Sequence, residues 1–144
     1  MDELIIEEIS DKKTLLDAFA LLKEIYPKMK KQQFLNYCQY MIDNSQIKFL
    51  GAFTNNKLVA VASYWIGVRL HSGKFIQIDN MITSRKHRNK QIATKLLNFV
   101  KEIGKKENCE KYVLDVFVDN HAGNKLYAKE KFDIAAFHLM QKIS

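Results

Sequence analysis

The most informative segment of the chain runs from residue 78 to residue 97 and reads Ile78-Asp79-Asn80-Met81-Ile82-Thr83-Ser84-Arg85-Lys86-His87-Arg88-Asn89-Lys90-Gln91-Ile92-Ala93-Thr94-Lys95-Leu96-Leu97. Its pattern changes from an apolar strand to a basic loop and then to a helix. A helix start leaves backbone N–H groups unpaired and carries the positive end of the helix dipole, so it binds anions. The segment therefore predicts a site for a polyanion such as a pyrophosphate. The alternative is a solvated basic loop before an ordinary amphipathic helix.

Length and composition define the class of protein around this segment. A chain of 144 residues is long enough for one domain with a buried core, and we expect a single domain over residues 1–144. With 47% hydrophobic and 27% charged residues it is globular, and its apolar runs are too short to span a bilayer. The net charge of +7 favours anionic partners without choosing among a nucleotide cofactor, nucleic acid and a membrane surface.

Two further features bear on location and metal binding. The acidic start, from Met1 to Glu8, lacks the features of a signal peptide, so a cytoplasmic protein is expected. Cys38 and Cys109 are far apart and have no partner motif, which indicates neutral thiols rather than a disulfide or a metal site. The four histidines show no metal-ligand spacing, and we predict no metal; they are His71, His87, His121 and His138.

Hydrophobic periodicity predicts alternating helices and strands along the chain. We expect strands over residues 4–9, 47–53, 58–68, 75–82, 112–118 and 132–143. We expect helices after Ser10 or Asp11, over residues 34–41, 92–106 and 123–129, with Pro27 ending the first. This order, β-α-α-β-β-β-α-β-α-β, predicts an α+β fold with helices on a mixed, mostly antiparallel sheet. The strands over 75–82 and 112–118 should be parallel neighbours that diverge at a ligand cleft.

Two motifs make the chain resemble the GNAT superfamily of acetyl-CoA-dependent N-acetyltransferases along nearly its whole length. The family's pyrophosphate loop, Arg/Gln-x-x-Gly-x-Gly/Ala, falls on Arg88-Asn89-Lys90-Gln91-Ile92-Ala93. The family's Asn-x-x-Ala/Gly-x-x-Leu-Tyr-x-Lys-x-Gly-Phe falls on Asn120-His121-Ala122-Gly123-Asn124-Lys125-Leu126-Tyr127-Ala128-Lys129-Glu130-Lys131-Phe132. Gln91 and Lys131 depart from the pattern because each stands where the family has glycine.

The resemblance implies that the chain binds acetyl-CoA. Backbone N–H groups of residues 88 to 94 would hold the pyrophosphate, and the arm of the cofactor would run beside the strand that ends at Met81, Ile82 and Thr83. Asn120 would add a side-chain hydrogen bond to this arm. The cofactor-binding residues implied are Met81, Ile82, Thr83, Arg88, Asn89, Lys90, Gln91, Ile92, Ala93, Thr94, Asn120 and Tyr127.

Acetyl transfer to an amine needs a general base for the amine and a general acid for the departing thiolate. Tyr127 matches the tyrosine that many family members use as the acid; its alternative is a packing role. Asp79 is the candidate base, and its alternative is a carboxylate held by neighbouring donors that only shapes the cleft. Asp115 is a second candidate base. The resemblance also places Tyr26, Phe34, Trp65 and Phe137 among candidate pocket residues, with His138 nearby.

The sequence thus favours an N-acetyltransferase that acts on a primary amine of a small molecule or peptide by direct attack in a ternary complex. A non-catalytic acyl-CoA sensor of the same fold is one alternative. A nucleic-acid-binding module that uses the lysines of the helix over 92–106 is another, but no nucleic-acid motif accompanies them. We expect no membrane partner. The acceptor cannot be read from the sequence, which also leaves the oligomeric state open, a homodimer included.

Overall fold

A computed structural model describes residues 3–88 and 90–144 of the chain. The chain forms two compact units, Met1–Val113 and Leu114–Ser144, and each is described by itself. The order of elements is β1 (Leu4–Ile9), α1 (Lys12–Leu22), α2 (Lys31–Asn44), β2 (Lys48–Thr54), β3 (Lys57–Arg69), β4 (Gly73–Thr83), a short 3-10 turn (Arg85–His87), α3 (Ile92–Lys106), β5 (Lys111–Leu114) and α4 (His121–Lys129).

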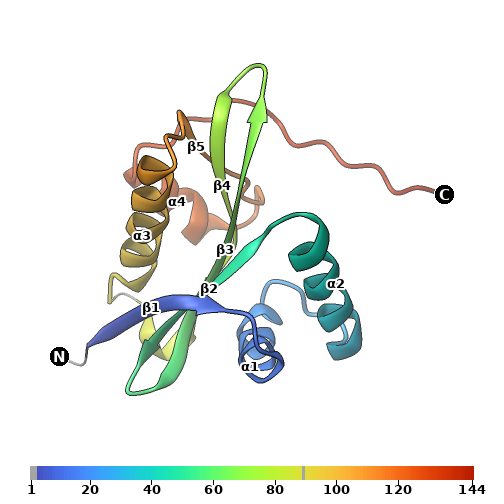
Figure 1. The fold of residues 1–144 in the computed structure, drawn as a ribbon, viewed down its shortest axis with the longest axis vertical. Coiled ribbons are helices and arrows are strands. Elements are labelled where there is room, and N and C mark those ends of the chain that lie inside the picture. Colours follow the sequence, from blue (N-terminus) through green and yellow to red (C-terminus); the bar gives the residue numbers. More distant parts are fainter. Residues whose placement is uncertain (1–2, 89) are drawn as a thin grey trace. The chain divides into compact units, whose positions relative to one another are not determined.

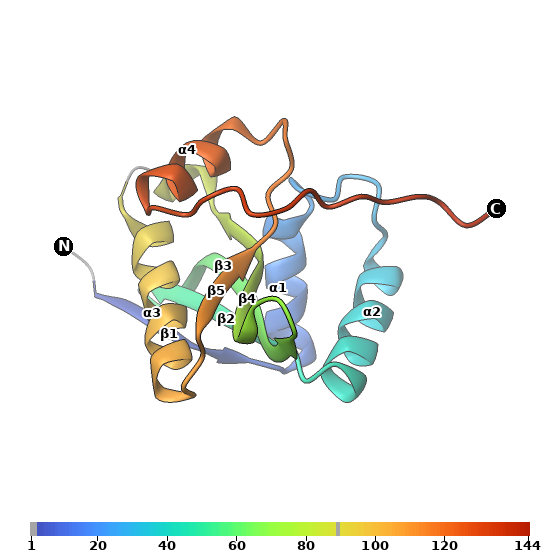
Figure 2. The same cartoon turned by 90° about the horizontal axis from the view of Figure 1, so that it is seen from above.

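The strands of the described residues form one sheet in the order β1-β2-β3-β4-β5. The first four strands are consecutive antiparallel neighbours, and short turns join β2 to β3 and β3 to β4. Helices α1 and α2 lie on one side of this sheet and α3 lies on the other (Figures 1 and 2). Because helices cover both faces, successive residues Phe75 to Ile78 of β4 are all buried instead of alternating with exposed ones. The predicted α+β fold with a mostly antiparallel sheet is confirmed.

The buried core explains why the first unit holds together. On one face of the sheet, Leu15, Leu22 and Phe34 from α1 and α2 pack with Phe49 of β2 and Val61 of β3. On α3 four apolar residues at helical spacing are buried, and they are Ile92, Leu96, Leu97 and Val100. Burying such side chains is the main favourable term in folding, at about 1.5–3 kcal/mol for each large one.

The start of α1 matches the sequence prediction, but its end does not. Asp11 is the N-cap, and its carboxylate accepts a hydrogen bond of 2.9 Å from the Thr14 backbone N–H. The helix already ends at Leu22, where turns at Ile25 and Tyr26 bond back to the Leu22 carbonyl. Pro27 therefore lies beyond the helix end and in the connection to α2 rather than at the point where the helix stops.

The start of β5 lies beside the start of β4, as expected for a parallel pair joined by a crossover helix. The Glu110 backbone N–H donates to the Lys74 carbonyl at 2.7 Å, and the Glu110 carboxylate accepts from the Lys74 N–H at 3.0 Å. β5 has only four residues, whereas the strand predicted here ran over 112–118, and β4 has eleven. The short β5 leaves the later part of β4 without a neighbouring strand on that side, among the residues that the structure describes.

The second unit contains α4 and an extended C-terminal segment. The strand predicted over 132–143 does not form, so this prediction is wrong for the described chain. Apolar side chains of the segment are exposed, including Ile134, Phe137 and Leu139 at 87–89%. Alternating apolar residues favour a strand only where a neighbouring strand and a covering layer are present, and the exposed side chains of this segment lack such a layer.

Candidate active site

The predicted phosphate-binding loop leads into α3 through an unusual residue conformation. Gln91 is the N-cap of α3 and has a left-handed backbone, with φ of 61° and ψ of 20°. A side chain is disfavoured in this region, whereas glycine enters it without a steric cost. Gln91 therefore has the backbone conformation that favours glycine, the residue usual at this position in the family's motif. The substitution of glutamine for glycine leaves this conformation of the loop in place.

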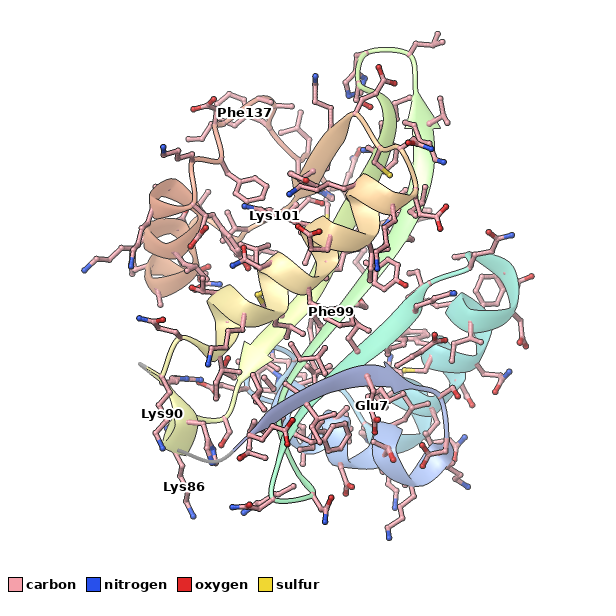
Figure 3. The ribbon with its side chains drawn as sticks, turned by 60° about the vertical axis from the view of Figure 1, so that its left-hand side comes forward. Glu7, Lys86, Lys90, Phe99, Lys101 and Phe137 are labelled. Atoms are coloured by element: carbon pink, nitrogen blue, oxygen red, sulfur yellow. The ribbon has the colours of Figure 1, made fainter. Side chains whose placement is uncertain are left out.

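The first turn of α3 has the properties of an anion site. The N-cap side chain makes no capping hydrogen bond, and no acidic residue lies in this first turn. The N–H groups of Ile92, Ala93 and Thr94 are the donors that a helix start leaves unpaired within the helix. Lys86 and Lys90 project from the loop before the helix (Figure 3). This donor set and its positive charge fit a pyrophosphate. Asn89, also predicted to bind the cofactor, lies outside the described residues.

Arg88 is held in place by two elements of the first unit. Its Nη2 donates to both carboxylate oxygens of Glu24 at 2.7 Å, and its Nε donates to the Thr83 carbonyl at 3.2 Å. Arg85 also contacts Glu24, at 3.4 Å, but its side chain is 78% exposed. The hydrogen bond from Arg88 is the main reason that the pKa of Glu24 lies below its ordinary value. Glu24 thus ties the end of α1 to the phosphate loop.

Strand β4 bulges where the cofactor arm is expected. Ala60 and Val61 pair with Thr83 and Ile82, but Ser63 pairs with Asp79, so two residues of β4, Asn80 and Met81, lie opposite one residue of β3. Asn80 has a φ of 55°, a left-handed conformation that asparagine tolerates better than most residues. A bulge interrupts the regular ladder and turns backbone groups in a new direction. The predicted arm-binding residues Met81, Ile82 and Thr83 therefore begin at this bulge.

The Asp79 carboxylate accepts hydrogen bonds from side chains of β3 and β4. Trp65 Nε1 donates to one carboxylate oxygen and Gln77 Nε2 donates to the other, each at 3.2 Å. Trp65 in turn packs edge-on against Phe75. Trp65 therefore orients Asp79 and is not among the residues that line the pocket described next. These hydrogen bonds hold the Asp79 carboxylate in a fixed position beside the bulge.

A pocket of about 610 Å³ lies in the first unit between α2, the end of α1 and strands β2 and β4. Of the candidate pocket residues, Tyr26 and Phe34 line it. The Tyr26 hydroxyl donates to Asn80 Oδ1 at 2.5 Å. Burial, and next the negative charge of Asp79, raise the pKa of the Tyr26 hydroxyl above its ordinary value. This contact connects the pocket to the bulge of β4.

The start of α4 shows why the motif over residues 120–132 has asparagine at its first position and a small residue three positions later. Asn120 is its N-cap, and Asn120 Oδ1 accepts a hydrogen bond of 2.9 Å from the Gly123 N–H. A Cβ at position 123 would lie 2.6 Å from Asn120 Nδ2, so the motif needs a glycine there in this chain. Because Oδ1 caps the helix, a hydrogen bond from Asn120 to the cofactor arm must come from Nδ2.

The end of α4 repeats the pattern seen at Gln91. Lys131, the second departure from the motif, has a φ of 66°. Its N–H donates to the Ala128 carbonyl at 3.0 Å, and the Phe132 N–H donates to the Tyr127 carbonyl at 2.9 Å, as in a Schellman motif. Tyr127 and Phe132 pack edge-on at 6.0 Å between ring centroids. Burial raises the pKa of Tyr127 above its ordinary value, so the phenol is protonated at neutral pH.

Asp115 and His138 are paired within the second unit. His138 Nδ1 lies 3.1 Å from Asp115 Oδ2, and both side chains are about half exposed. From the sequence, Asp115 is a candidate base and His138 is a candidate neighbour of the pocket, with no link between them. In the structure the two side chains form a pair. Phe137, the neighbouring candidate pocket residue, is 87% exposed.

Two residues of the site were missed by reasoning from the sequence. Glu24 accepts hydrogen bonds from Arg88, which lies 64 positions later in the sequence. Asn80 accepts a hydrogen bond from Tyr26, which lies 54 positions earlier. No local pattern marks Glu24. Asn80 carries a weak signal, because an asparagine inside an apolar strand is a common sign of a left-handed residue.

Cys38 and Cys109 are free thiols, as predicted. Burial raises the pKa of the Cys38 thiol to about 11, and it also raises that of Cys109. Both therefore stay neutral at physiological pH.

Within the described residues, no helix is long and apolar enough to cross a membrane.

Several solved structures are similar to the chain in fold. Glucosamine-6-phosphate N-acetyltransferase from Arabidopsis thaliana is 17% identical, with a TM-score of 0.75, over 99% of this chain and 100% of that one. Ribosomal-protein-alanine N-acetyltransferase from Brucella melitensis biovar Abortus 2308 is 21% identical, with a TM-score of 0.75, over 99% of both chains. A predicted acetyltransferase from Clostridium acetobutylicum, solved with acetyl-CoA, is 20% identical, with a TM-score of 0.75, over 97% of this chain and 96% of that one.

Sequence comparison extends the similarity from fold to family. No curated protein matches the chain in sequence. Residues 15–132, which include the phosphate loop and α4, match the acetyltransferase (GNAT) family. The family binds acetyl-CoA. By this match the chain belongs to the GNAT family of acetyltransferases and is an acyltransferase.

Proposed function

We propose that the chain is a single-domain N-acetyltransferase that moves an acetyl group from acetyl-CoA to a primary amine by direct attack in a ternary complex. The observation that carries the proposal is the start of α3, where unpaired N–H groups follow a basic loop and a left-handed Gln91. Family membership supports the donor. The Asn80 bulge, with a fixed carboxylate beside it and a pocket next to it, supports an amine acceptor.

The residues proposed to hold the cofactor are those of the loop and of β4. Arg88, Lys90 and the backbone from Gln91 to Thr94 would bind the pyrophosphate, and the backbone of Met81, Ile82 and Thr83 would bind the arm. Asn120 Nδ2 would add a side-chain donor. When bound, acetyl-CoA supplies a thioester whose carbonyl carbon is open to attack by an amine.

The proposed roles of Asp79 and Tyr127 follow from the proton balance of the transfer. An acceptor that arrives as an ammonium group first loses one proton to become a neutral amine, and this proton passes to solvent. As the C–N bond forms and the C–S bond breaks, a second proton leaves the nitrogen and one proton reaches the departing sulfur. Asp79, whose carboxylate accepts from Trp65 Nε1 and Gln77 Nε2 beside the bulge, takes the amine proton directly or through a water. Tyr127, protonated at neutral pH, gives its hydroxyl proton to the sulfur.

The cofactor assignment is tested by thermal unfolding with coenzyme A and by thiol release with acetyl-CoA and an amine. Because a ligand that binds only the folded state stabilises it by mass action, coenzyme A at about a hundred times its Kd should add about 2.7 kcal/mol to the free energy of unfolding. Thiol release should require the amine. Stabilisation without any amine-dependent release would identify the chain as an acyl-CoA sensor. Salt-sensitive DNA binding unaffected by coenzyme A would favour the nucleic-acid module instead.

Glycine at position 91 should stabilise the protein. A left-handed residue with a side chain costs about 1–2 kcal/mol, part of which is offset by the larger unfolded-state entropy of glycine, so Gln91→Gly should gain about 0.5–1 kcal/mol. Removing the Cβ should also tighten coenzyme A binding, because the phosphates can approach the backbone more closely. Thermal unfolding and calorimetric titration measure the two effects.

Lys131→Gly is the matched control for this prediction, since it relieves the same conformation at the end of α4. It should bring a similar gain in stability and leave coenzyme A affinity unchanged. Loss of stability in Gln91→Gly, or equal effects of both variants on affinity, would contradict the assigned role of the loop.

A further inference from the structure

The pocket beside the β4 bulge has a chemical character that narrows the acceptor. Its walls are mostly aromatic side chains and thioethers, among them Tyr26, Phe34, Tyr37, Met29 and Met41. A volume of about 610 Å³ is within the usual range for sites that enclose small organic molecules. Aromatic rings and methionine sulfur both make favourable contacts with a flat aromatic ligand. The walls therefore suit an apolar, ring-sized body.

The same walls are unsuited to a ligand with several positive charges. None of the described residues that line the pocket is charged; the polar groups are tyrosine hydroxyls, the amides of Asn36 and Asn80 and the neutral thiol of Cys38. An ammonium group removed from water needs a carboxylate or several acceptors to offset its lost hydration. A polyamine or an aminoglycoside would bring ammonium groups that this pocket cannot compensate.

One end of the pocket, however, can receive a single amine. Asn80 lines the pocket, and the adjacent Asp79 holds its carboxylate between Trp65 and Gln77. The Tyr26 hydroxyl, bonded to Asn80, lies close enough to Asp79 for that charge to shift its pKa. One ammonium group placed here meets the Asp79 carboxylate and amide and phenol oxygens, beside the bulge at which the residues proposed to bind the cofactor arm begin.

We infer that the acceptor is a primary monoamine carried on an aromatic body, with the amine at Asn80 and Asp79 and the ring between Phe34, Tyr37 and Met41. This inference rests on the proposed transferase function. The ring is bound by burial of apolar surface, and the amine is placed by the Asp79 carboxylate and the Asn80 amide. Specificity then comes from exclusion of additional charges as much as from attraction of the ring.

The test compares acceptors with the full chain at saturating acetyl-CoA. 2-Phenylethylamine should give a kcat/KM roughly ten- to a hundredfold above that of ethylamine, because burial of a phenyl ring stabilises the bound state by a free energy that corresponds to this factor. Spermidine and kanamycin should be poorer than 2-phenylethylamine. Equal or better values for ethylamine, spermidine or kanamycin would overturn the acceptor class while leaving the transferase function standing.

Variants on α2 locate the ring. Tyr37 lines the pocket and is 50% exposed, so Tyr37→Ala should fold normally. It should raise the KM for 2-phenylethylamine several-fold and leave the KM values for ethylamine and acetyl-CoA unchanged. Gln39→Ala is the matched control, because Gln39 is exposed on the same helix and does not line the pocket. Equal effects of the two variants would overturn the placement.

A binding measurement separates failure of this inference from failure of the proposed function. Ligand-detected NMR of 2-phenylethylamine is recorded with saturating coenzyme A, for the wild type and for Tyr37→Ala. Binding that depends on Tyr37 in a protein that acetylates no amine would uphold the pocket assignment and overturn the transferase. Absence of binding in the wild type would overturn the inference itself.

Discussion

Replacing Tyr127 with phenylalanine is expected to lower kcat by roughly two to four powers of ten at neutral pH, the usual worth of general acid catalysis. The phenol is protonated at this pH because burial raises its pKa, and Phe keeps the edge-on contact with Phe132. Folding and coenzyme A affinity should therefore hardly change. Steady-state kinetics with both substrates saturating, and calorimetric titration with coenzyme A, measure the two quantities.

The pH dependence distinguishes proton donation from packing. The thiol of coenzyme A has a pKa of about 8.5 by analogy with cysteine, so its thiolate needs less help to leave as the pH rises toward that value. The defect of Tyr127→Phe should shrink accordingly. Tyr112→Phe is a suitable control, since it removes a hydroxyl that donates to the Lys101 carbonyl at 3.4 Å and has no assigned chemical role. Wild-type turnover of Tyr127→Phe at pH 7 would reduce Tyr127 to a packing residue.

Much of the fold was predictable because its signals are local. The apolar stripe of α3 gave bounds of residues 92–106 that match the structure, and the turns of the meander separate β2, β3 and β4 as expected. The prediction of the last strand, over residues 132–143, is wrong because strand formation depends on contacts that are not local. A strand is defined by its partner as well as by its own residues, and alternation over 132–143 says nothing about whether a neighbouring strand is present.

The same division applies to the candidate site. Both motifs were recognised by their resemblance to the family's patterns, and the left-handed Gln91 and Lys131 show why glycine is the usual residue at these positions. The contacts that hold the site were not visible. Glu24 reaches Arg88, and Tyr26 reaches Asn80, across folded structure that joins distant parts of the chain. The bulge in β4 depends on a register shift against β3, and within β4 only Asn80 carries a weak signal of it.

Charge reversal at Arg88 is expected to weaken coenzyme A binding by roughly ten- to a hundredfold, the usual worth of a charge-assisted hydrogen bond. Arg88→Glu would place a carboxylate beside the pyrophosphate and also beside Glu24. Arg85→Glu is the matched control, because it makes the same change of charge in the same loop at a side chain that is 78% exposed. Calorimetric titration at low and moderate salt should show the larger loss for Arg88→Glu.

A substitution at Glu24 tests whether this carboxylate orients the guanidinium of Arg88 for phosphate binding. The contacts of Arg88 with Glu24 and Thr83 use Nη2 and Nε, which leaves the Nη1 donors to meet a phosphate. If Glu24 orients the guanidinium, Glu24→Gln should weaken coenzyme A binding several-fold and by much less than Arg88→Glu. Tighter binding in Glu24→Gln would mean that the carboxylate competes with the pyrophosphate for Arg88. An unchanged affinity in Arg88→Glu would remove Arg88 from the cofactor site and leave the backbone of α3 as its anion-binding element.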